Sequence, residues 1–316
     1  MSELTFENLA EQLMLLGQRG AYAESLELLQ RESGRFPDRE QATYYWRMRL
    51  AVRINNLALA LQFFRELLEH GYSLPPHWLR EDENLKPLQG LPEYEDLVAV
   101  CQLKFAELQA NAKPEMLIMH PDGGVSTSSQ PRSLLLALHG NAGNISGTLG
   151  PWRGVVDQGW LLVLPQSSQA IDENAFVWDD WDKAAAEIQE HYVSLTHRYA
   201  IGERVIVGGF SMGGGLAIWL TLSRIIRAHG FVVLAPYVPD IEKLEPLLER
   251  ARTDGVHGYI IVGERDNGCL EIAHKLNALL NVNGIPCQLE LRPGLGHTYP
   301  PDFDESLEKA LAFVTQ

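Results

Sequence analysis

The chain has 316 residues, 46% hydrophobic and 21% charged, a length and composition typical of a folded protein with one large or two smaller domains. Its formal net charge of −15 argues against nucleic acid and against an anionic membrane surface as partners, because phosphate binding requires clustered lysine and arginine. The 3 cysteines lack CxxC spacing, so neither a disulfide framework nor a zinc site is expected.

The start of the chain carries acidic residues early and no apolar run of the signal-peptide type. No segment of the sequence is apolar over the length that crosses a membrane. We therefore expect a cytoplasmic protein that does not enter a membrane.

Residues 1–112 are predicted to form an all-α domain. From Leu4 to about Leu108 apolar residues recur at helical spacing, and few β-branched runs interrupt them. Breaks in this pattern fall at Gly17–Gly20, Phe36–Asp38, Asn55–Asn56 and Gly71–Pro76. We expect four helices that pair as hairpins, then a loop containing Trp78, and a further helix near Tyr94–Gln109.

Two segments of this helical region are similar to each other. Gly20, Tyr22 and Leu26 begin the first, and Ala60, Leu61 and Phe64 occupy matching places about 35 residues further on. The spacing resembles the second helix of a tetratricopeptide repeat, which implies a protein partner for these helices. The first helix lacks the tryptophan of that repeat, and the second copy lacks its closing proline. The alternative is a plain helical extension that packs on the rest of the protein.

From residue 113 onward the pattern changes to short apolar runs, most of them alternating with amphipathic helices. The predicted strands are Met116–Met119, Leu134–Leu138, Trp160–Leu164, Val205–Val207, Phe231–Leu234, Tyr259–Val262 and Gln288–Leu291. The predicted helices are Lys183–Arg198, Met212–Ala228, Ile241–Arg252 and Leu270–Asn281. Several runs are apolar throughout, as in parallel strands covered on both faces. Residues 113–316 therefore predict a doubly wound, mostly parallel α/β sheet.

A candidate nucleophile lies in Gly209-Phe210-Ser211-Met212-Gly213, directly after one predicted strand and at the start of a predicted helix. A serine at a sharp strand-to-helix turn sits in strained backbone, and flanking glycines allow strand and helix to approach closely. The turn raises the Ser211 hydroxyl above the sheet edge, at the positive end of the helix. The pattern GxSxG alone is common, but in this position it predicts a catalytic serine.

A serine hydroxyl needs a base to accept its proton. His297 follows the last predicted strand in Gly294-Leu295-Gly296-His297, a loop that can bring an imidazole over the sheet edge. No other histidine after Ser211 has this position, although a capping or surface role is the alternative for His297. We therefore predict that His297 is the base.

The base needs an acid that holds its tautomer and stabilises the imidazolium. Asp266 follows the strand Tyr259–Val262, and the order Ser, Asp, His after successive strands is that of α/β-hydrolases. Glu264, two residues away, and Asp240, after the preceding strand, are the competing candidates.

The loop His139-Gly140-Asn141-Ala142-Gly143-Asn144 follows the strand Leu134–Leu138, where such folds supply one donor to an oxyanion hole. The residue after the nucleophile supplies the other. We expect the backbone amides of Asn141 and Met212 to be these donors. His139 is expected to hold the loop by a hydrogen bond.

Taken together, residues 113–316 resemble the α/β-hydrolase superfamily, and within it the compact esterases of the phospholipase/carboxylesterase and dienelactone-hydrolase groups. The features that match are the Leu-His-Gly-Asn-Ala-Gly loop, the elbow Gly-Gly-Phe-Ser-Met-Gly-Gly, and the positions of the Asp and of the late Gly-His. In those families an apolar pair often follows the acid, whereas Asn267 and Gly268 follow Asp266 here. The resemblance covers none of the first 112 residues.

The loop Gln166–Asp182 follows the strand Trp160–Leu164 and is expected at the carboxyl edge of the sheet, where ligands bind. Its Trp178 and Trp181 either wall a substrate pocket or anchor the loop to the core. Tyr299 is placed similarly, so Trp178 and Tyr299 are the candidate substrate-binding residues. Only one helix is predicted between Leu234 and Tyr259, so no cap domain is expected there. The N-terminal helices could cover the site or bind a protein partner.

The sequence thus predicts a serine hydrolase that cleaves a small or medium ester through an acyl-enzyme, without metal or cofactor. Thioesterase and peptidase activity would use the same residues. The alternative from another class is a helical-repeat interaction protein in which the hydrolase domain is secondary.

Overall fold

The computed structural model describes residues 6–121 and 131–316. The chain divides into two compact units. The first contains the described residues of Met1–Ala112 together with Ile171–Glu173, and the second contains those of Lys113–Ala170 and Asn174–Gln316. The segment Ile171–Glu173, expected in the second domain, thus groups with the first. The predicted helical region begins at Leu4, which lies outside the described residues.

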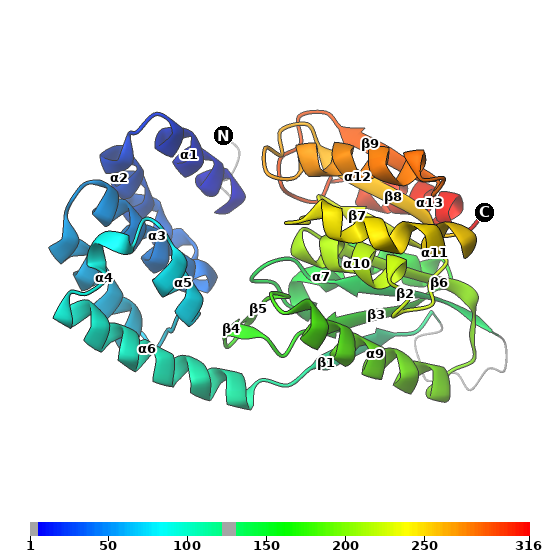
Figure 1. The fold of residues 1–316 in the computed structure, drawn as a ribbon, viewed down its shortest axis with the longest axis horizontal. Helices are drawn as coiled ribbons and strands as arrows, with labels where there is room; N and C mark the ends of the chain where they lie inside the picture. The colour runs from blue at the N-terminus through cyan, green and yellow to red at the C-terminus, as the bar shows by residue number, and fades with distance from the viewer. Residues whose placement is uncertain (1–5, 122–130) are drawn as a thin grey trace. The chain divides into compact units, whose positions relative to one another are not determined.

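The described part of residues 1–112 in the first unit is helical (Figure 1). Its α-helices are α1 (Phe6–Gln18), α2 (Tyr22–Glu32), α3 (Glu40–Arg53), α4 (Leu57–Glu69), α5 (Pro76–Glu81) and α6 (Pro92–Asn111). Short 3-10 turns lie at Ser33–Arg35, Pro37–Arg39 and Lys86–Leu88. Along the chain α1 packs on α2, α2 on α3 and α3 on α4, and α6 contacts α4 and α5.

Local sequence explains where these helices begin and what they bury. Asn56 caps α4, because its side-chain oxygen accepts a hydrogen bond from Leu59 N at 3.1 Å. The buried face of α4 contains Ala60, Leu61 and Phe64. The expectation of a loop around Trp78 is wrong. A proline at the first turn of a helix loses no hydrogen bond, so Pro76 starts the short helix α5 there.

The second unit is built on a seven-stranded sheet, counted over its described residues, in the order β1-β3-β2-β6-β7-β8-β9 (Figure 1). Its strands are β1 (Glu115–Met119), β2 (Arg132–Leu138), β3 (Leu161–Gln166), β6 (Ile201–Phe210), β7 (Gly230–Leu234), β8 (His257–Gly263) and β9 (Cys287–Arg292). Strand β1 runs antiparallel to β3, and the other neighbours are parallel. The predicted α/β-hydrolase fold, mostly parallel and preceded by helices, is therefore confirmed.

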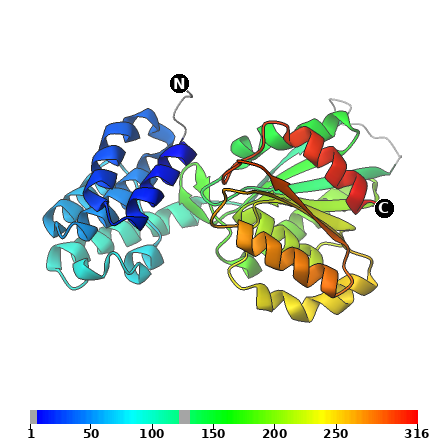
Figure 2. The same ribbon diagram turned by 90° about the horizontal axis from the view of Figure 1, so that it is seen from above.

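Helices cover both faces of this sheet (Figure 2). They are α7 (Ile145–Trp152), α8 (Gly154–Asp157), α9 (Trp181–Arg198), α10 (Met212–Leu222), α11 (Leu248–Thr253), α12 (Leu270–Val282) and α13 (Phe303–Val314). Seen along the sheet, α13 lies on one face and α11 and α12 lie on the other. Helix α10 ends earlier than predicted, at Leu222, because Arg224 takes a positive φ of 62°. The predicted helix Ile241–Arg252 is a 3-10 segment, Ile241–Leu247, followed by α11, and Pro246 lies where the two meet.

The direction of the chain connections reverses at β2, in the middle of the sheet. Strand β2 lies between β3 and β6, so the chain leaves β2 to one side and later returns on its other side. Ligands bind at such a switch point in open α/β sheets. The segment that follows β3 holds a small hairpin, β4 (Ala170–Asp172) and β5 (Ala175–Phe176), where a loop was expected.

Candidate active site

Ser211 stands at the turn between β6 and α10, in a conformation that side chains rarely adopt. Its φ is 55° and its ψ is −119°, a combination that costs free energy unless neighbouring structure enforces it. Backbone hydrogen bonds supply that enforcement: Ser211 N donates to Leu234 O at 2.9 Å, and Tyr237 N donates to Ser211 O at 2.9 Å. The strained serine predicted from the GxSxG pattern is therefore present in this backbone.

Glycine at 213 is required by the close approach of α10 to the end of β2. A Cβ atom on Gly213 would lie 2.2 Å from His139 O and 2.6 Å from Leu138 O, which no side chain tolerates. The first turn of α10 therefore lies directly against the loop that follows β2. The first N–H groups of a helix have no acceptor within the helix, so the start of α10 is suited to bind negative charge.

His297 lies on the loop after β9 and connects Ser211 to Asp266. Its Nδ1 donates to Asp266 Oδ2 at 2.7 Å, which in a neutral imidazole leaves Nε2 to accept from the Ser211 hydroxyl at 2.9 Å. The structure thus brings together the three residues that the chain order Ser, Asp, His suggested. They come from three separate strand ends, those of β6, β8 and β9.

The carboxylate of Asp266 is held on both of its oxygens. It is 3% exposed, and Oδ1 accepts hydrogen bonds from Gly268 N at 3.2 Å and Cys269 N at 3.0 Å, just before α12. The competing acids lie elsewhere: Glu264 is exposed, and Asp240 is exposed and forms an ion pair with Lys243. Among the candidates, Asp266 contacts the imidazole.

His139 is buried and holds the loop after β2, as expected. Its Nδ1 donates to Gly140 O at 2.9 Å, and its Nε2 accepts from Ser167 N at 3.4 Å. Burial lowers the pKa of His139 from 6.5 to about 4, so the ring is neutral near pH 7.

The predicted oxyanion donors, Asn141 and Met212, lie at the ends of neighbouring strands. Asn141 is in the turn that Gly143 N closes on Gly140 O at 3.1 Å, and Met212 is the first residue of α10. Their role as donors stays a prediction.

The two candidate substrate-binding residues have structural contacts that the sequence did not reveal. Trp178 is 1% exposed, its Nε1 donates to His139 O at 2.9 Å, and its ring stacks on that of His139 at 4.5 Å. Tyr299 accepts a hydrogen bond from Trp152 Nε1 at 3.0 Å, and burial raises its pKa. The contacts of Trp178 favour its interpretation as an anchor of its loop. The Tyr299 hydroxyl is engaged inside the fold, while the side chain as a whole is partly exposed. Substrate binding by either residue stays a prediction.

Two residues near Ser211 escaped sequence reasoning. The ring of Phe210 lies 4.8 Å from that of His297 and 4.9 Å from that of Tyr299. Tyr237, whose N–H binds Ser211 O, is exposed in an otherwise buried segment, Gly230–Val238. Position next to the serine was the only available signal for Phe210. Nothing in the pattern of the sequence distinguished Tyr237.

Asp266, Cys269 and His297 also place three metal-ligand atoms within 4.8 Å of one another, the one such group among the described residues. The hydrogen bonds at Asp266 account for this proximity, because Oδ2 binds the imidazole and Oδ1 binds two amides. The cluster is therefore explained as an acid–base pair.

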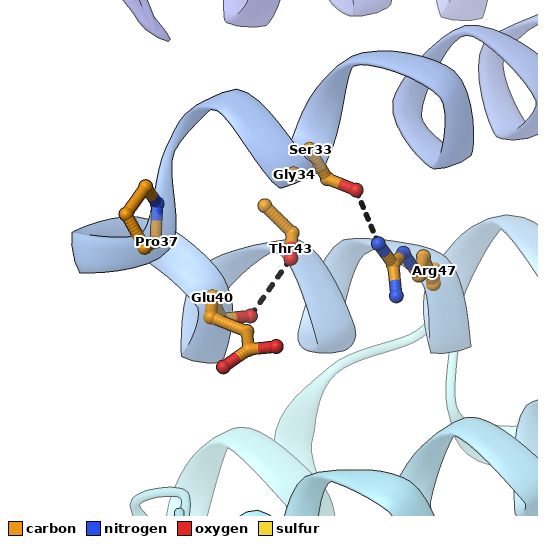
Figure 3. A pocket seen from close by; sticks show the side chains of 6 residues that line it. All are labelled: Ser33, Gly34, Pro37, Glu40, Thr43 and Arg47. Carbon is orange, nitrogen blue, oxygen red and sulfur yellow. Dashed lines mark hydrogen bonds between the residues drawn. The ribbon is translucent and has the colours of Figure 1, made fainter.

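A cavity of about 160 Å³ lies in the helical unit (Figure 3). It is lined by Ser33, Gly34, Pro37, Glu40, Thr43 and Arg47. Arg47 donates to the Ser33 hydroxyl, and the Thr43 hydroxyl donates to Glu40 O at 2.8 Å. The Glu40 carboxylate accepts from the Tyr72 hydroxyl at 3.0 Å. These polar groups are thus paired within the fold, whereas Arg47 Nε is buried without a hydrogen-bond partner.

Comparisons with known proteins agree with this architecture. A family model described as "A/B hydrolase-like, N-terminal domain" matches residues 5–110. An uncharacterized protein from Bacillus cereus ATCC 10987 shares 28% identity over 98% of this chain and 99% of its own, with a TM-score of 0.57. No curated protein sequence matches the chain. The likeness of the helices to tetratricopeptide repeats is not among these findings and stays a prediction.

Two solved esterases share the fold at lower identity. Esterase PE8 is 18% identical, with a TM-score of 0.53 over 64% of this chain and 98% of its own. A ferulic acid esterase is 16% identical, with a TM-score of 0.51 over 65% of this chain and 98% of its own. In the part of the chain that the structure describes, no helix is both long and apolar enough to cross a bilayer. By its helical N-terminal match and its sheet, the chain is an α/β-hydrolase-like protein with an N-terminal helical domain.

Proposed function

We propose that this protein is a serine hydrolase that cleaves carboxylic esters through an acyl-enzyme. The single observation that carries the proposal is the continuous hydrogen-bond series from Ser211 Oγ through both nitrogens of His297 to Asp266. Esterase PE8 and the ferulic acid esterase, which share the fold, make carboxylic esters the first substrates to test.

In the proposed reaction, Ser211 Oγ attacks the ester carbonyl while His297 Nε2 accepts the hydroxyl proton. The imidazolium that forms is stabilised by Asp266 through Nδ1–H. The tetrahedral oxyanion would accept hydrogen bonds from the amides of Asn141 and Met212, and such a donor is typically worth about 3–4 kcal/mol. His297 then returns the proton to the leaving alcohol. Water, deprotonated by the same imidazole, releases the acid and restores Ser211.

The test is hydrolysis of p-nitrophenyl acetate and butyrate, together with labelling by a fluorophosphonate. Ser211→Ala should abolish both, because no other serine among the residues that the structure describes has the turn geometry and the adjacent imidazole. Ser223→Ala is the matched control. Ser223 directly follows the last residue of the same helix, and its hydroxyl donates a hydrogen bond to Leu220 O. Activity of Ser211→Ala within tenfold of wild type, with an unchanged circular dichroism spectrum, would exclude Ser211 as nucleophile.

A further inference from the structure

The backbone of the loop before His297 is held, since Arg265 N donates to Leu295 O at 2.9 Å, but the imidazole that follows it is only partly covered. Gly294 takes a φ of 69°, and no atom lies within 4 Å of the Cβ position of either Gly294 or Gly296. The His297 side chain is 41% exposed. The position of the imidazole therefore depends on what contacts the ring itself.

Three contacts reach that ring from within the second unit. Asp266 binds Nδ1 and the Ser211 hydroxyl binds Nε2, and these two hydrogen bonds at the ring edge leave the ring able to tilt about the line that joins its nitrogens. Phe210 packs against the ring: its ring centre lies 4.8 Å from that of the imidazole, with 38° between the planes. Aromatic rings attract each other at this separation. This ring contact is what restrains the tilt.

Phe210 is itself firmly held. It is the last residue of β6, directly before Ser211, and a Cβ atom on Gly140 would lie 2.9 Å from Phe210 Cδ1. Its ring centre is 4.9 Å from that of Tyr299. Tyr299 in turn contacts Phe303 at 5.1 Å and accepts the hydrogen bond from Trp152. Through these contacts Phe210, at the end of β6, is connected to Trp152 in α7 and Phe303 in α13.

We propose that Phe210 is a positioning residue that holds the His297 ring in line with Ser211 Oγ. The inference rests on the proposed function of these residues. Phe210 and Ser211 are adjacent in the chain. The Phe210 ring therefore positions the His297 base relative to the same backbone segment that carries the proposed nucleophile. Tyr299 packs against Phe210 and is itself held by Phe303 and Trp152. A displacement of about 1 Å in reacting groups can cost about 100-fold in rate.

The test compares Phe210→Leu, which removes the ring, with Phe210→Tyr, which keeps it. We expect Phe210→Leu to lower kcat for p-nitrophenyl acetate by about 10- to 100-fold while KM changes less than threefold, because proton transfer suffers and binding does not. Phe210→Tyr should restore kcat to within about threefold of wild type. Phe231→Leu is the matched control: it shortens a buried phenylalanine in β7, loses stability, and should keep kcat.

A second measurement does not depend on turnover. The proton between His297 Nδ1 and Asp266 gives a downfield NMR signal, which should broaden or disappear in Phe210→Leu and persist in Phe210→Tyr and in Ser211→Ala. A Phe210→Leu variant with wild-type kcat and an intact signal would overturn the positioning role. Failure of the proposed function is a different result, in which Ser211→Ala keeps its activity whatever Phe210 does.

Discussion

At the scale of single residues, the acid of the site is decided by contacts on both carboxylate oxygens. Asp266 receives two amide hydrogen bonds on Oδ1 and presents Oδ2 to His297. Glu264, two residues earlier, is exposed. Two acidic residues that are only two positions apart therefore differ: Asp266 is buried and oriented by hydrogen bonds, whereas Glu264 is exposed to solvent.

We predict that Asp266→Asn lowers kcat by about 10⁴-fold, because an amide favours the wrong tautomer of the histidine. Glu264→Gln, the matched control, should leave kcat within a few-fold of wild type. Steady-state hydrolysis of p-nitrophenyl butyrate by the two variants checks this. A mild effect of Asp266→Asn combined with a severe effect of Glu264→Gln would reverse the assignment.

At the scale of elements, the loop after β2 is held by a histidine that burial keeps neutral. Burial lowers the pKa of His139 to about 4 in the folded chain, against 6.5 for a solvent-exposed histidine in the unfolded chain, so the unfolded state binds more protons between these pH values. The stability that neutral His139 contributes is therefore complete above about pH 6.5 and is lost as the pH falls toward 4. The loop that carries Asn141 should loosen in that window.

We predict that between pH 7.5 and pH 5 the wild-type protein loses about 2 kcal/mol more unfolding free energy than His139→Gln. The glutamine variant lacks this titration, while the other titrating groups are common to both proteins and cancel in the difference. Urea unfolding at the two pH values measures it. Parallel pH dependence of the two proteins would contradict a depressed pKa at His139.

At the scale of the whole molecule, the chain holds two compact units, each with its own buried cluster of apolar side chains. The aromatic residues Tyr44, Tyr45, Trp46, Phe63 and Phe64 predict more aromatic surface in the first unit than short helical hairpins need internally. In the structure Tyr44, Phe63 and Phe64 are buried within the helical cluster itself, and Tyr45 packs partly buried against it, so much of that surface is used internally.

Removal of residues 1–112 tests whether the helices shield the site. We predict that the fragment 113–316 changes KM for bulky esters more than KM for acetate, because a shielding domain would contact the larger substrate. Circular dichroism establishes that the fragment is folded. Unchanged kinetics on both substrates would make the helices a separate binding module.

The positions of the strands along the chain, and the three residues proposed as nucleophile, acid and base, could be predicted from the sequence because both depend on local patterns. Apolar runs at strand length, glycines around Ser211, and a Gly-His after the last strand are visible in the chain without contacts. The helices α7 and α13 were not predicted. Pro151 within α7 obscured the pattern of that helix. In α13, by contrast, Phe303, Leu307 and Ala310 recur at helical spacing, so this helix could have been predicted from the sequence.

The sequence by itself determined the fold class, the sharp turn at Ser211 and the order in which the proposed nucleophile, acid and base occur. Only the tertiary structure decided which side chains meet. Trp178 and Tyr299 lie near the sheet edge in sequence, and only the structure shows that their rings contact those of His139 and Phe210. The physical reason is that a hydrogen bond or ring contact depends on distances between residues far apart in the chain, and periodicity carries no information about such distances.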